Sequence, residues 1–112
     1  MGTLARAHCM GCGYDSKLLP LGAGMFNFMD VCWMPASCPK CQQVVTIDVL
    51  AGRASCPACR QAVASYATAG GGEDEFSWRL PSGEVLSVLK EGNPCPACGA
   101  PLLQIQFVGN FD

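Results

Sequence analysis

Apolar and polar residues alternate in short runs along this chain, and these runs predict β-strands. Clusters of Gly, Pro, Ser and Asp separate the runs. The strand candidates span residues 16–21, 43–49, 60–66, 76–80, 84–89 and 102–108. The turn Pro81-Ser-Gly83 lies between two of them and predicts a hairpin. We expect a small, mostly β protein of short antiparallel strands with little helix, preceded by a frayed arm at residues 1–7.

The most apolar stretch, from Met25 to Met34, has an ambiguous periodicity. Asn27 and Asp30 are spaced for one face of a helix, whereas Phe26 and Phe28 suit one face of a strand. Two interpretations of its Met, Phe and Trp side chains stay open. They form the core, or part of the stretch is an exposed surface that binds a protein partner.

Cysteine usage changes the picture, because 112 residues with 13 Gly and 8 Pro bury only a modest core without a further stabilising element. Eight of the nine cysteines fall into four Cys-x2-Cys units, here called knuckles one to four: Cys9/Cys12, Cys38/Cys41, Cys56/Cys59 and Cys95/Cys98. A structural zinc ion takes four such ligands in tetrahedral geometry. The eight thiolates therefore predict two closed structural sites and a cofactor content of two Zn²⁺.

Disulfides would be the alternative use of so many cysteines, and they belong to oxidising compartments. Met1 to His8 lacks the apolar core of a secretory signal, and no run approaches the eighteen apolar residues of a membrane span. We therefore expect a cytoplasmic protein with reduced thiols and no membrane association.

Four knuckles can be paired in three ways. Pairing knuckles two and three closes a loop of fourteen residues, whereas consecutive pairing closes loops of twenty-five and thirty-five residues. The difference in closure entropy is under about 1 kcal/mol per site. Loop length favours the first arrangement without deciding it.

Residues 38–63, CPKCQQVVTIDVLAGRASCPACRQAV, resemble zinc ribbons of the CPxC…CPxC type, including the ribbon that precedes some zinc-containing thioredoxins. The resemblance implies an inner zinc on Cys38, Cys41, Cys56 and Cys59. It leaves an outer zinc to Cys9, Cys12, Cys95 and Cys98. Gln42 and Arg60 stand where such ribbons often have glycine after the second cysteine.

In this arrangement the inner site lies between the two halves of the outer site along the sequence. The arrangement is similar to that of the cysteine-rich domain of DnaJ co-chaperones, in which outer repeats also pair with outer and inner with inner. None of the four knuckles here reads C-x-x-C-x-G-x-G, so the chaperone function is not carried over. The resulting expectation is one double-zinc-ribbon domain over residues 1–112. Its inner ribbon spans 36–67, and its outer site is built from 8–35 and 76–112.

Two residues with metal-binding side chains are left over. We expect Cys32, between Val31 and Trp33, to be a small buried apolar residue. His8 could replace Cys9 as a ligand only by breaking the regular Cys-x2-Cys geometry. No catalytic motif or phosphate-binding loop stands out, so we expect no enzyme.

Charge separates the remaining functions. The net charge is −2, and two zinc tetrathiolate sites take it to about −6, which disfavours phosphate backbones. We expect a zinc-binding structural or adaptor protein that binds another protein, with Met25 to Met34 in the contact. A nucleic-acid-binding ribbon is the first alternative, because Lys40, Arg53 and Arg60 outnumber Asp48 around the inner site. Redox work or electron transfer at a four-cysteine site is the second.

Overall fold

The computed structural model describes residues 2–23, 30–51, 54–70 and 76–111, and the regular secondary structure of this part of the chain consists almost entirely of strands. The only helical element described there is η1, one short 3₁₀ segment at Val49–Ala51. The strands are β1 (Gly2–Cys9), β2 (Leu19–Leu21), β3 (Trp33–Cys38), β4 (Gln43–Asp48), β5 (Ala64–Ser65), β6 (Thr68–Ala69), β7 (Ser77–Arg79), β8 (Val85–Ser87) and β9 (Leu103–Phe111). The prediction of a mostly β fold with little helix is confirmed.

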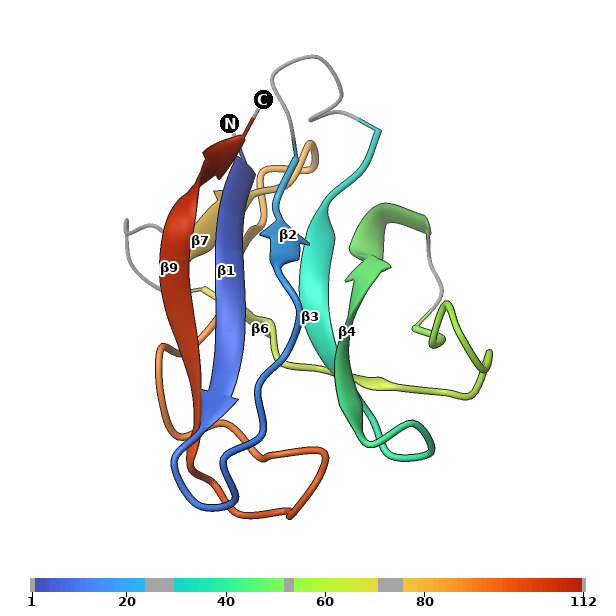
Figure 1. The fold of residues 1–112 in the computed structure, drawn as a ribbon. Helices are drawn as coiled ribbons and strands as arrows, with labels where there is room; N and C mark the ends of the chain where they lie inside the picture. Colours follow the sequence, from blue (N-terminus) through green and yellow to red (C-terminus); the bar gives the residue numbers. More distant parts are fainter. Residues whose placement is uncertain (1, 24–29, 52–53, 71–75, 112) are drawn as a thin grey trace.

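The strands form three small sheets in which every described pair is antiparallel. Their strand orders are β2-β1-β9, β4-β3-β5 and β6-β8-β7. Figure 1 shows β1 and β9 running side by side, with the β3 and β4 pair next to β2. The first and last strands of the chain therefore belong to one sheet.

The prediction of a frayed arm at residues 1–7 is wrong. β1 is the central strand of its sheet, and it pairs with β9 from Gly2↔Phe111 to Cys9↔Leu103. Its core-facing positions include Ala5 and Ala7, both completely buried. Small side chains give a weak apolar pattern, and the partner strand lies a hundred residues further along the chain. Neither feature is visible in a local reading of the sequence.

The other strand predictions differ mainly in length. Three strands, β4, β7 and β8, lie within the predicted ranges 43–49, 76–80 and 84–89. The last strand, β9, begins within the predicted range 102–108 and extends beyond it to Phe111. Of residues 16–21 only β2 is a strand, and its Pro20 is tolerated because β2 lies at a sheet edge. Of residues 60–66 only β5 is a strand.

The stretch from Met25 to Met34 is only partly described, because residues 24–29 lie outside the described residues. Cys32 and Met34 are buried, and Met34 lies in β3 with no exposed surface. The core interpretation therefore holds for Met34, whereas Trp33 in β3 is only half-buried. The prediction for Phe26 and Phe28 falls outside the described residues.

A single apolar cluster joins the three sheets. The first sheet contributes Ala5, Ala7 and Ile105 to this cluster, and the second sheet contributes Met34 and Val44. The third sheet is joined to it by Phe76, just before β7, and by Val88, just after β8. Alanine and cysteine side chains supply a large share of this cluster. The apolar area that it buries is correspondingly small.

The corrected position of β1 leads to a paired test. Ala7→Leu should lower the free energy of unfolding by about 1–3 kcal/mol, because a completely buried alanine has no room for a larger side chain. Arg6→Leu adds a similar side chain on the exposed face of the same strand, and it should change stability by under about 0.5 kcal/mol. Chemical denaturation of the metal-loaded protein measures both. Equal effects would mean that residues 1–7 are an unpaired arm.

Candidate metal sites

The first four-cysteine group joins the two ends of the chain. Cys9 ends β1, and knuckle four lies shortly before β9. The Sγ atoms of Cys9 and Cys98 lie 3.7 Å apart, and those of Cys12 and Cys95 lie 3.8 Å apart. Cys9 and Cys95 are buried, whereas Cys12 and Cys98 are exposed. We call this group the outer cluster.

The second group, the inner cluster, is carried by the sheet β4-β3-β5. Knuckle two is the turn between β3 and β4, and knuckle three is closed by the bridge Ser55↔Ala62. The Sγ atoms of Cys38 and Cys59 lie 3.5 Å apart, and those of Cys41 and Cys56 lie 3.9 Å apart. The structure therefore brings knuckle one to knuckle four and knuckle two to knuckle three.

The spacing of the sulfur atoms fits a tetrahedral metal ion. With metal–sulfur bonds of about 2.3 Å, an ideal tetrahedron separates its sulfurs by about 3.8 Å. All four ligand atoms of each cluster lie within 4.8 Å of one another. Each cluster can therefore hold one ion, and its four sulfurs would fill a tetrahedral coordination shell completely.

Backbone N–H groups prepare some of these sulfurs to be thiolates. The N–H groups of Cys12 and Gly11 donate to the Cys9 sulfur and lower the pKa of Cys9 to about 6. The N–H of Cys59 does the same for Cys56, whose pKa falls to about 7. The neighbouring Cys59 and Cys38 sulfurs instead raise the pKa of Cys41 to about 12. A divalent cation would remove this repulsion and allow all four thiols to ionise.

All four knuckles end on a residue in the left-handed backbone region. Gly13 and Gly99 have φ values of 79° and 78°, and Gln42 and Arg60 have 53° and 64°. In three of the knuckles this residue donates its N–H to the carbonyl oxygen of the first cysteine, at Gly13 (3.0 Å), Arg60 (2.8 Å) and Gly99 (2.8 Å). Gln42 and Arg60 therefore form the same turn that glycine forms in the outer knuckles, at the steric cost of a side chain.

The two left-over residues lie outside both clusters. His8 Nδ1 lies 2.7 Å from the Asp15 carboxylate, so its side chain pairs with an acid. Cys32 is only 4% exposed, and burial raises the pKa of its thiol to about 11. The expectation that Cys32 is a buried apolar residue is confirmed.

Two tyrosines that sequence reasoning did not single out connect the two cluster regions. Tyr14, two residues after Cys12, accepts a 2.8 Å hydrogen bond at its hydroxyl from the N–H of Val44 in β4. Tyr66, just after β5, donates its hydroxyl to the carbonyl oxygen of Pro94 over 2.6 Å. Each bond joins one cluster's region to the other's. The position of Tyr14 immediately after a knuckle was the only sequence signal.

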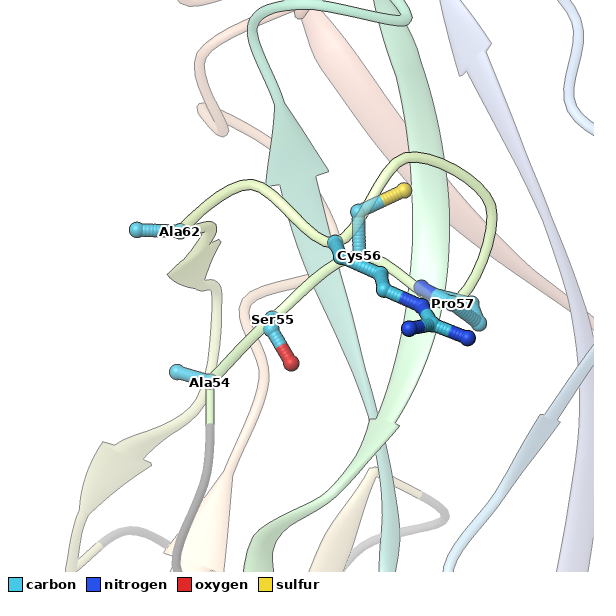
Figure 2. A pocket seen from close by; sticks show the side chains of 6 residues that line it. Ala54, Ser55, Cys56, Pro57 and Ala62 are labelled. Carbon is cyan, nitrogen blue, oxygen red and sulfur yellow. The ribbon is translucent and has the colours of Figure 1, made fainter.

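A shallow pocket of about 530 Å³ lies beside knuckle three. Its lining consists of Ala54, Ser55, Cys56, Pro57, Arg60 and Ala62. Figure 2 shows the Cys56 sulfur and the Ser55 hydroxyl pointing in opposite directions. The described residues of this lining include neither a histidine nor a carboxylate that could act as a general base for Ser55.

Comparison with known proteins gives no further assignment. No protein-family model matches this chain, and no curated protein or solved structure is significantly similar to it. Among the described residues, no helix has the length and apolar character needed to cross a membrane.

The knuckle geometry predicts a glycine-specific effect. Gly13→Ala should destabilise the metal-loaded protein by about 1–2 kcal/mol, because alanine is strained in the left-handed region although no atom blocks its Cβ. Gly109→Ala is the matched control, since its Cβ also meets no atom within 4 Å and its φ is ordinary. Denaturant titration measures both variants. Equal stability of the two would contradict the turn geometry.

Proposed function

We propose that this protein is a zinc-binding structural and adaptor protein, in which two closed zinc sites hold a scaffold that binds another protein. The supporting observation is that both clusters contain four converging cysteine sulfurs. Four thiolates in tetrahedral geometry favour zinc or iron over harder cations. Because the ligands fill the coordination shell, the sites have no open position for a substrate or an activated water.

A non-enzymatic role fits the surroundings of the clusters. Catalytic zinc sites use three protein ligands and keep the fourth position for water. The pocket beside knuckle three lacks a base, and Cys32 has a raised pKa that disfavours a reactive thiolate. We place the protein in the cytoplasm, where these thiols would stay reduced and available to metal.

Nucleic-acid binding is the alternative, and it has one observation in its favour. Lys40 and Arg60, one in each inner knuckle, are both exposed. Two cations beside a cluster of formal charge −2 are a small basic patch, and the metal-loaded chain has a net charge of about −6. The charge balance therefore favours a protein partner.

Metal content tests the scaffold part of the proposal. Native mass spectrometry should find two zinc ions per chain in colourless protein, because each cluster holds one ion and iron would give colour. Replacing the four outer cysteines, Cys9, Cys12, Cys95 and Cys98, by serine should leave one ion, and Cys32→Ala should leave two. Consecutive pairing of the knuckles predicts that the outer replacements remove both ions.

The partner class needs a separate control. The double variant Lys40→Glu and Arg60→Glu is compared with the matched double variant Arg6→Glu and Arg79→Glu. If the protein has any salt-sensitive affinity for DNA or RNA, both double variants should lower that affinity equally. All four of these residues are exposed. Specific loss in the inner pair would make nucleic acid the ligand and contradict the adaptor proposal.

A further inference from the structure

Exposed apolar side chains gather beside the outer cluster. Six large apolar side chains are strongly exposed in the described part of the chain, and two of the six, Met10 (61%) and Leu102 (46%), line one open pocket of about 270 Å³. Leu89 (63% exposed) begins the turn that supplies Glu91 and Gly92 to the same pocket. Exposed apolar residues that are grouped in this way often mark a protein interaction site.

Hydrogen bonds hold the two sides of this pocket in place. The N–H of Met10 donates to the carbonyl oxygen of Leu102 over 2.9 Å. On the other side, the buried amide of Asn93 donates to the carbonyl oxygens of Leu89 (2.9 Å) and Leu103 (3.3 Å). The turn is therefore fixed against β9. A surface that is already rigid loses little conformational entropy on binding.

Leu102 also rests directly on knuckle one. A Cβ built on Gly11 would lie only 3.0 Å from the Leu102 Cδ1 atom. The absence of a side chain at Gly11 thus makes room for Leu102 beside the cluster. The shape of the apolar surface depends on the outer cluster being formed.

The charges around the surface are mainly negative. Glu91 lines the pocket, and the exposed Cys12 and Cys98 belong to a cluster whose zinc-bound form carries a formal charge of −2. Of the nearby cations, Lys90 places its Nζ 5.9 Å from the Phe76 ring centroid. Arg6 is exposed on β1. It lies two residues before His8, and His8 is the strand partner of the pocket residue Gln104.

This charge pattern selects among possible occupants. A second copy would bring the same acidic groups together, and nucleic acid would bring its phosphates to them. A partner segment that places Lys or Arg beside an apolar side chain complements the apolar centre, the Glu91 carboxylate and the negative charge of the zinc-bound cluster. It would also contact a surface that the metal keeps in shape.

We propose that the surface formed by Met10, Pro101 and Leu102 binds a protein segment in which an apolar side chain is flanked by Lys or Arg. The inference rests on the proposed adaptor function and gives its partner a chemical class. It places the contact beside the outer cluster instead of at Met25 to Met34, where Cys32 and Met34 are buried and residues 25–29 lie outside the described residues.

The test is a selection of random dodecapeptides displayed on phage against the zinc-loaded chain, followed by fluorescence anisotropy with the synthetic peptides. The enriched peptides should combine an aliphatic or aromatic residue with nearby Lys or Arg, and salt should weaken their binding. Met10→Glu and, independently, Leu102→Glu should each weaken binding at least about tenfold. The matched control Leu18→Glu adds the same charge at an exposed leucine elsewhere, 47% exposed, and should leave affinity unchanged.

Each variant is first checked for two bound zinc ions and an unchanged circular dichroism spectrum. Failure to enrich any peptide, enrichment of peptides without basic residues, or indifference to both surface variants would overturn the proposal. Peptides that lose binding only in Leu18→Glu would leave the adaptor function standing and show that its surface lies elsewhere. A dimer seen by light scattering and abolished by Met10→Glu would identify a second copy as the occupant, which also overturns it.

Discussion

The outer cluster imposes the constraint on which the rest of the fold depends, because its four sulfurs come from opposite ends of the chain. Cys12 and Cys95 are separated by eighty-two residues, and closing such a loop costs about 4 kcal/mol of chain entropy. Structural zinc contributes roughly 10–16 kcal/mol of apparent binding energy, which exceeds this cost several-fold. Once knuckles one and four meet, β1 and β9 lie in one register from Cys9↔Leu103 to Ala5↔Phe107, and the register shifts by one residue between Ala5 and Leu4.

Among the described residues, the interior is a weaker source of stability, because many of its side chains are small. Ala5, Ala7 and the buried cysteines occupy positions that leucine or phenylalanine fills in a thicker core. The hydroxyls of Tyr14 and Tyr66 then join the two cluster regions through hydrogen bonds to Val44 and Pro94. These bonds connect the two metal-binding regions within one structure.

The sequence predicted the chemistry of this protein better than its topology. The Cys-x2-Cys spacing identified all eight clustered cysteines, and the β-branched residues of 43–49 and the alternation in 102–108 located two strands. β1 was missed because its core residues are alanines and its partner is at the far end of the chain. The left-handed turns at Gln42 and Arg60 show that the knuckle backbone overrides residue preference.

Metal removal tests the central claim most directly, because the account makes the two clusters the main source of stability. A strong chelator should collapse the amide dispersion in the ¹H–¹⁵N NMR spectrum, and two equivalents of zinc should restore it, since the thin apolar core cannot offset the chain entropy alone. A dispersed spectrum that persists in protein verified to be metal-free would contradict the account. It would show that the core folds without the clusters.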